Sequence, residues 1–146
     1  MISGITILDT NVVSEPMRPS PSAAVLTWWS QQQPGALFIT TVTVAEILYG
    51  IELLPHGKRR DALLAGAERM FGKVLAGHIL PFDEGAARAF PEVAVRRRGQ
   101  GRPIADLDAQ IAAIAHSRGA ILATRNTVDF EGCGLRLVNP WQHAES

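Results

Sequence analysis

The sequence predicts an α/β fold, a single-domain three-layer α/β/α sandwich with a parallel central sheet. Short apolar runs of strand length alternate with longer segments of helical periodicity, an order that implies right-handed crossovers between parallel strands covered on both faces. The chain has 146 residues, the length of one domain, which is expected to span residues 1–146. Its composition, 47% hydrophobic and 19% charged, is typical of a globular chain.

The first half of the chain is expected to begin with two strands and two helices. The apolar run Gly4–Leu8 favours a strand, and Ser22–Gln32 favours a helix between flanking prolines. Leu37–Thr40 favours a second short strand. A helix over Thr43–Leu54 follows and is stopped by Pro55.

The next segments continue the alternation. Apolar residues at helical spacing predict a long helix over Lys58–Val74, and His78–Phe82 predicts a strand. Glu84–Arg98 is expected to be a helix with a kink or a break at Pro91. A helix ended by a glycine and two further strands complete the order: Ile104–Arg118, Ala120–Thr124 and Leu135–Val138.

Composition excludes several classes of protein. Fourteen basic residues balance fourteen acidic ones, so any contact with nucleic acid must rest on local patches. The single cysteine, Cys133, rules out an intrachain disulfide framework and fits a reducing cytoplasm. The N-terminus lacks the pattern of a signal peptide, and no apolar run reaches the roughly 20 residues of a membrane span. We therefore expect a cytoplasmic protein without membrane contact.

The expected first strand ends at Asp9, followed by Thr10 and Asn11. In parallel α/β folds, ligands gather beyond the carboxyl ends of the strands, which is where Asp9 is expected to lie. All three residues are also good helix-cap types, so one interpretation is that they only cap the next helix. Asp9 as part of a binding site is the other interpretation.

Glu46 is also expected at this edge of the sheet. Thr43 and Glu46 match a capping box, with Thr43 at the N-cap and Glu46 three residues later in the first turn. Glu46 is nevertheless the only charged residue from Thr43 to Ile51. A carboxylate in such an apolar segment is expected to have a partner, because burying an isolated charge is costly.

Two acids begin the helix expected over Ile104–Arg118. On an ideal helix, Asp108 lies roughly 80° and Asp106 roughly 120° from the centre of the core stripe. Asp106 is therefore the better candidate for a solvent-facing or capping role, whereas Asp108 borders the packed face. The stripe itself is expected to consist of residues spaced three and four apart: Ile104, Leu107, Ile111 and Ile114.

Three polar residues follow the strand Ala120–Thr124, namely Arg125, Asn126 and Asp129. Asn126 and Asp129 fit a loop or a cap, and either also fits a ring with the acids above. Converging carboxylates stay ionised only when a cation neutralises them. Because the four histidines show no metal-ligand spacing, oxygen ligands favour Mg²⁺ or Mn²⁺ over zinc. Such a metal at an open edge suits hydrolysis of a phosphodiester.

Four segments of the sequence resemble the PIN-domain family and, within it, the VapC-type toxins of toxin–antitoxin pairs, especially their FitB-like branch. The resemblance covers nearly the whole chain, and these segments carry it: LDTNVVSEPMRP, TVAEILYGIELLPHGKRR, ILPFDEGAA and DAQIAAIAHSRGAILATRNTVDFEGCGLRLVNPW. The resemblance implies a metal-dependent endoribonuclease with Mg²⁺ or Mn²⁺ as cofactor. It also implies a homodimer that a cognate antitoxin silences, in a heterotetramer or a larger complex. The RNA target does not follow from it.

The resemblance also assigns residues. The family's first three acids fall on Asp9, Glu46 and Asp108, where DAQIAA matches, and not on Asp106. The fourth position stays open, because relatives can carry an acid after TR, where this chain has Asn126, whereas Asp129 fits the form TRNxxDF. Three hydroxyl and amide side chains match positions that support the acids by hydrogen bonds: Thr10, Asn11 and Thr124.

Two further questions stay open from the sequence. Arg125, Arg97 and Arg98 are candidates for contacting RNA, although basic residues at a helix C-terminus also stabilise the helix dipole. The alternative functions are a catalytically silent fold that binds RNA or a partner, and a receiver-type phospho-acceptor domain. The second alternative lacks the adjacent pair of acids after strand one and the lysine after the last strand.

Overall fold

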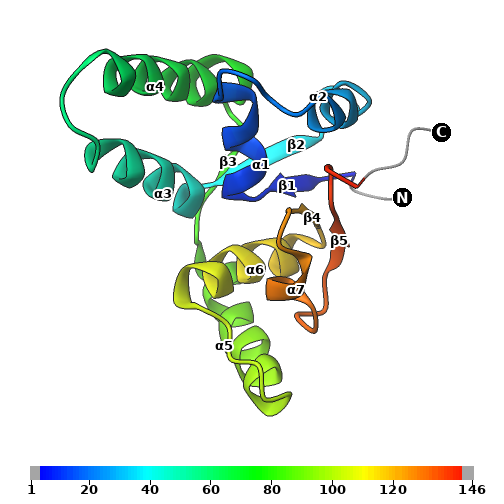
Figure 1. The fold of residues 1–146 in the computed structure, drawn as a ribbon. Coiled ribbons are helices and arrows are strands. Elements are labelled where there is room, and N and C mark those ends of the chain that lie inside the picture. Colours follow the sequence, from blue (N-terminus) through cyan, green and yellow to red (C-terminus); the bar gives the residue numbers. More distant parts are fainter. Residues whose placement is uncertain (1–3, 143–146) are drawn as a thin grey trace.

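Five parallel strands form the central layer of the computed structural model, which describes residues 4–142 (Figure 1). The prediction that the N-terminus lacks a signal peptide concerns residues that partly lie outside this range. The spatial order of the strands is β3-β2-β1-β4-β5. Their bounds are β1 Thr6–Leu8, β2 Leu37–Thr40, β3 Ile79–Leu80, β4 Ile121–Ala123 and β5 Arg136–Val138. Each expected strand is present, with shorter ends for all but β2.

Helices cover both faces of this sheet (Figure 1). One face is covered by α1 to α4, with short turns η1 and η2, and the other by α5 to α7. Their bounds are α1 Thr10–Ser14, η1 Glu15–Met17, α2 Ala23–Ser30, α3 Thr41–Glu52, α4 Lys58–Arg69, η2 Met70–Val74, α5 Glu84–Gly99, α6 Asp106–Arg118 and α7 Thr127–Phe130. The predicted three-layer sandwich is confirmed.

Alternation along the strands produces two separate cores. Ile7 points into the core under α5 and α6, whereas its neighbour Leu8 points into the core under α1 to α4. Leu122 and Ala123 of β4 divide in the same way. Successive side chains of a strand face opposite sides, so strands this short and apolar are stable only with helices on both faces.

The start of α3 differs from the prediction. Thr40 is the N-cap, and its hydroxyl accepts a hydrogen bond from the Thr43 N–H at 3.1 Å. The expected capping box from Thr43 to Glu46 is therefore wrong, because the helix begins at Thr41. Glu46 lies in the second helical turn instead of the first, and its carboxylate is free for other contacts.

Three other helix predictions are corrected. The long helix over Lys58–Val74 ends as an α-helix at Arg69 and continues as one π-helical segment. Of the kink or break expected at Pro91, the break is absent, since α5 runs unbroken and buried residues on both sides of Pro91 pack into the same core. Leu107 is 46% exposed and outside the core stripe, because it lies in the first turn of α6 and lines an open pocket shared with α3.

The topology reverses direction at β1. From β1 the chain first adds β2 and β3 on one side and then crosses to add β4 and β5 on the other. The carboxyl ends of β1 and β4 therefore diverge into helices on opposite sides, the arrangement that places ligand sites in open α/β sheets. None of the helices in the described range has the length and apolarity needed to span a membrane.

Candidate active site

Asp9 lies at the reversal point, directly after β1, and is 5% exposed. Its N–H donates to the carbonyl of Ala123 at 2.8 Å, which continues the pairing of β1 with β4. Its carboxylate accepts two hydrogen bonds of 2.8 Å, one at Oδ1 from the Thr10 N–H and one at Oδ2 from the Thr124 hydroxyl. Asp9 is thus the N-cap of α1 and also a buried carboxylate aimed by its neighbours.

Thr10 connects Asp9 to the acid of α3. Its hydroxyl donates to Oε1 of Glu46 at 2.7 Å and lies 3.4 Å from the hydroxyl of Thr43. The N-cap at Thr40 fixes where α3 begins and hence which turn presents Glu46 to the edge. The partner expected for Glu46 is therefore a neutral hydroxyl donor on α1.

Asp108 and Asp106 occupy the first turn of α6 but differ in burial. Asp108 is half-buried, whereas Asp106 is exposed and makes no cap hydrogen bond. The sequence placed Asp108 nearer the packed face, and the structure agrees.

The segment after β4 contributes Thr124, Arg125, Asn126 and Asp129. Thr124 is fully buried, and its hydroxyl also accepts the Asn126 N–H at 3.0 Å. Asn11 accepts the Arg125 N–H at 3.2 Å, so the loops after β1 and β4 are bonded to each other. Asn126 and Asp129 are exposed at the start of and within α7.

The acids affect one another electrostatically. Burial raises the pKa of Asp9, and the charges of Glu46 and Asp129 raise it further against the hydrogen bonds from Thr124 and Thr10. Burial also raises the pKa of Asp108 to about 6, with the charges of Asp9, Asp129 and Glu46 adding to the effect. The structure therefore brings Glu46 and Asp129 within range of both Asp9 and Asp108. Asn126 adds no charge to this set.

This donor set suits a hard divalent cation. Carboxylate and hydroxyl oxygens are the ligands that Mg²⁺ and Mn²⁺ prefer, and a cation would relieve the repulsion that raises both pKa values. Among residues 4–142, no three acidic, histidine or cysteine side chains are close enough together to surround an ion as they stand.

The arginines differ from one another. Arg97 is 5% exposed and donates to backbone carbonyls, so its burial argues against the direct RNA contact predicted for it. Arg98 is exposed. Arg125 is also exposed, beside the acids, and its guanidinium lies 4.9 Å from the ring centroid of Trp141. For these two residues RNA contact stays a prediction.

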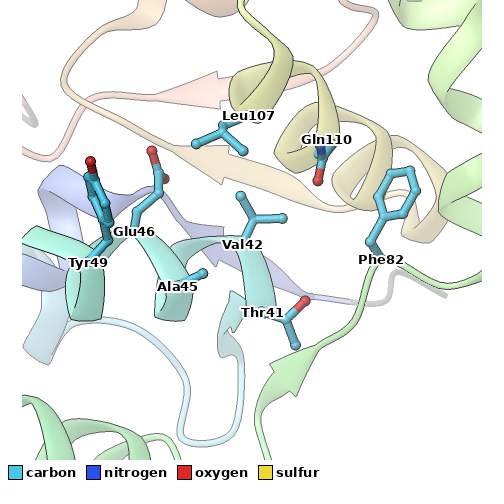
Figure 2. Close-up of a pocket in the computed structure, with 8 residues that line it drawn as sticks. All are labelled: Thr41, Val42, Ala45, Glu46, Tyr49, Phe82, Leu107 and Gln110. Atoms are coloured by element: carbon cyan, nitrogen blue, oxygen red, sulfur yellow. The ribbon is translucent and has the colours of Figure 1, made fainter.

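A groove of about 700 Å³ opens beside Glu46 (Figure 2). It lies between α3 and the first turns of α6, and Figure 2 shows Glu46 and Tyr49 side by side at one end and Phe82 at the other. Apart from Glu46, none of the residues that line this groove was predicted to belong to a site. A signal was present in Tyr49, which lies one turn after Glu46 and is 67% exposed.

A known protein family matches most of the chain. Its family model, that of the PIN domain, matches residues 6–131. The chain belongs to the PIN-domain family. The match runs from β1 to the residue after α7, so it contains all four acids of this PIN domain.

Individual relatives agree with the family match. The chain is 43% identical over 136 residues to a plasmid stability protein, StbB, of Pseudomonas syringae pv. tomato, which covers 93% of this chain and 98% of that protein. It is 39% identical over 138 residues to a VapC ribonuclease of Sinorhizobium fredii, covering 94% and 99% of the two chains. A crystal structure of FitAcB from Neisseria gonorrhoeae superposes with a TM-score of 0.85 at 36% identity, covering 95% and 100%.

Proposed function

We propose that this PIN domain is a metal-dependent endoribonuclease and the toxin of a toxin–antitoxin pair. The observation that carries the proposal is the meeting of Asp9, Glu46, Asp108 and Asp129 at one sheet edge, where the charges of Glu46 and Asp129 act on Asp9 and the charges of all three act on Asp108. Relatives that the chain matches over nearly its whole length are named as a VapC ribonuclease and as toxin FitB, and these names support the same activity.

In this proposal the acids hold Mg²⁺ or Mn²⁺, with Asp9, Glu46 and Asp108 as ligands and Asp129 as the fourth acid. When bound, the metal would activate water and stabilise charge on the phosphoryl oxygens. The protein side chains fix the acids before that. Thr124 and the Thr10 N–H orient both oxygens of Asp9, and the Thr10 hydroxyl orients Glu46.

Asn11 and Asn126 support the site through the backbone. Asn11 holds the Arg125 N–H, and the Asn126 N–H is bonded to Thr124. We place Asp129 at the fourth acidic position, because its charge acts on both Asp9 and Asp108, whereas Asn126 carries no charge. Arg125 and Arg98, both exposed, are proposed to contact the RNA backbone.

The proposed partners are RNA as substrate, a cognate antitoxin and a second copy of the chain. We expect a homodimer in the cytoplasm and a heterotetramer or larger complex with antitoxin. Support comes from the structural relatives, one of which is FitAB bound to a DNA fragment, with 37% identity and a TM-score of 0.85. Two exposed large side chains, Tyr49 of α3 and Leu53 directly after it, fit a face that a partner covers.

The family match separates the two alternative functions. Membership of the PIN-domain family contradicts the receiver-type alternative. A catalytically silent PIN fold is the remaining alternative, and it predicts binding to RNA or a partner without cleavage.

The experiment is a cleavage assay on single-stranded RNA with the purified protein. We expect cleavage with added Mg²⁺ or Mn²⁺ and none with EDTA. A Glu46→Gln variant, purified in parallel, should be inactive and so controls for contaminating ribonuclease. Cleavage that persists in EDTA or in the variant would refute metal-dependent hydrolysis at this site, and RNA binding without cleavage by the parent would support the silent fold.

A further inference from the structure

Arg97 is a buried arginine in the last turn of α5, and the proposed mechanism does not use it. It lies on a different element from every acid of the site. Its guanidinium nevertheless reaches the segment that carries Asp129. The Nη1 group donates to the backbone carbonyls of Asp129 and, at 3.1 Å, of Glu131. The Nε group donates to the carbonyl of Arg102 at 2.7 Å.

These bonds join three parts of the chain. Arg97 belongs to α5, Arg102 to the loop before α6, and Asp129 and Glu131 to the end of α7. A guanidinium presents several N–H donors in a rigid plane, which suits the bridging of carbonyls at fixed angles better than a single ammonium does. The short helix α7 has four residues and no side-chain cap at its N-terminus, so its position depends on such external bonds.

The charge of Arg97 is also unusual. In the described part of the chain it takes part in none of the ion pairs, although it is 5% exposed. Burial of an unpaired cation is costly, and a neutral side chain would pack there at lower cost. The carbonyl dipoles and the negative charges of the acids offset the cost of burying this cation. The charge of Arg97 in turn lowers the pKa of Asp108.

We propose that Arg97 is a positioning residue of the site, which fixes the Asp129–Glu131 backbone and so holds the Asp129 carboxylate beside the other acids. The inference rests on the proposed nuclease function for its catalytic meaning. Its structural part, the fixing of α7 by Arg97, can be measured without any RNA.

The main test replaces Arg97 with Met, which retains the aliphatic length and removes the donors and the charge. Relative to the parent, hydrogen exchange should become faster in residues 127–133 and stay unchanged in the strands. Mn²⁺ affinity, measured by calorimetry, and kcat for RNA cleavage should each fall by about 10- to 100-fold, the usual effect of losing a group that orients ligands, with KM little changed.

Two controls separate positioning from general destabilisation. Val93→Ala removes buried volume one turn away on the same helix and leaves in place the bonds of Arg97 to the Asp129 and Glu131 carbonyls. Arg102→Ala removes an exposed arginine that also bonds to Glu131 but not to Asp129. Both should leave Mn²⁺ affinity within about twofold of the parent, even where the melting temperature falls. An equal loss of Mn²⁺ affinity in Val93→Ala, at an equal loss of stability, would overturn the proposal.

A double-mutant cycle identifies the route. If Arg97 acts through Asp129, combining Arg97→Met with Asp129→Asn should lose much less than the product of the two single losses. Multiplicative losses would overturn the proposal. Should Arg97→Met fail to fold, Arg97→Lys replaces it, because a lysine keeps the charge but loses the fork. Unchanged exchange in residues 127–133 and unchanged Mn²⁺ affinity in Arg97→Lys would equally overturn it.

The same measurements distinguish this inference from the proposed function. A parent protein that binds Mn²⁺ but does not cleave RNA refutes the nuclease, while the exchange and affinity data still decide the role of Arg97. A parent that cleaves RNA, with an Arg97→Met variant of normal affinity and normal kcat, refutes only the role of Arg97.

Discussion

The Asp9–Glu46 half of the acidic edge and the Asp108–Asp129 half are built differently. Asp9 and Glu46 accept hydrogen bonds from Thr10 and Thr124, whose hydroxyls lie next to them in the structure. In residues 4–142, neither of the other two carboxylates accepts a side-chain hydrogen bond that would aim it. The first half is oriented by local hydroxyls, and the second half depends on where α6 and α7 are placed. Substitutions in the two halves should therefore differ in their effects on cleavage and on stability.

The largest expected effect is on catalysis, from the loss of an acid in the less supported half. Asp108→Asn should reduce cleavage by about 100-fold or more, because it removes a charge that the metal needs. The matched control is Asp106→Asn, two residues away on the same helix, exposed and solvent-facing. It should keep cleavage within a few fold of the parent. The opposite ranking of the two variants in an RNA cleavage assay would contradict the assignment of Asp108.

The next effect concerns the supported half. Thr124→Val keeps the shape of a fully buried side chain but removes the donor to Asp9 and the acceptor of the Asn126 N–H. Unfolding free energy should fall by about 1–3 kcal/mol, the cost of leaving buried polar groups unsatisfied. Cleavage should fall by about 10-fold, less than for Asp108→Asn. Denaturant titration and initial rates measure both, and Thr124→Ser, which retains the hydroxyl, should recover most of the activity.

The fold was predictable because its signals are local. Alternating strand-length and helix-length apolar segments predicted the sandwich, and Gly119 ends α6 in the left-handed conformation, with φ of 62°, as predicted. The boundaries that failed depend on tertiary context. The start of α3 depends on the Thr40 cap, and the continuity of α5 through Pro91 depends on packing against α6. The order of the strands follows from the pairing of β1 with both β2 and β4, which no local signal specifies.

The site divides in the same way. The positions of the acids after β1, in α3 and in α6 could be predicted from the sequence. The helical phase also predicted that Asp108 lies nearer the packed face than Asp106. Arg97 was misjudged, since a run of arginines at a helix end suggests exposure, and only the structure shows that this one is buried and bonded to the carbonyls of Asp129 and Glu131. The groove beside Glu46 was missed because Leu107 was assigned to the core.

A smaller effect is expected from pH. The pKa of Asp108 in the metal-free fold is raised to about 6 from its ordinary value of 3.8. Below the ordinary value the carboxyl is protonated in both folded and unfolded chains and costs nothing. Between about pH 3.8 and pH 6 the carboxyl ionises in the unfolded chain but keeps its proton in the fold, so the stability of the fold falls across this window and levels off above it. In EDTA, the stability of the parent relative to Asp108→Asn should therefore decrease from pH 4 to pH 7, by on the order of 1 kcal/mol.

Added Mg²⁺ sharpens that measurement. A bound cation favours the ionised carboxylate, so the pH-dependent difference between parent and Asp108→Asn should shrink or reverse when Mg²⁺ is present. Thermal melts at several pH values, with EDTA and with Mg²⁺, test it. A difference that is independent of pH in EDTA would mean that Asp108 is not desolvated by its surroundings.

The smallest effect on stability is expected where the acid is best supported. Asp9→Asn can keep its oxygen on the Thr10 N–H, but its amide group then faces the Thr124 hydroxyl, which must accept instead of donate. Burial raises the pKa of Asp9, so the charged carboxylate destabilises the metal-free fold. Removing that charge offsets the change in hydrogen bonding. The metal-free variant should thus match the parent or exceed it by no more than about 1 kcal/mol.

The same variant decides whether Asp9 only caps α1. An asparagine also caps well, so a capping role alone predicts that Asp9→Asn keeps both the Mg²⁺-dependent rise in melting temperature and the cleavage rate. If Asp9 is a ligand, both should be lost while the metal-free melt stays nearly unchanged, because stabilisation by a ligand requires binding to the fold. Retention of both properties would leave Asp9 as the end of a strand and move the metal toward Asp108 and Asp129, the half of the edge that has no hydroxyls to aim it.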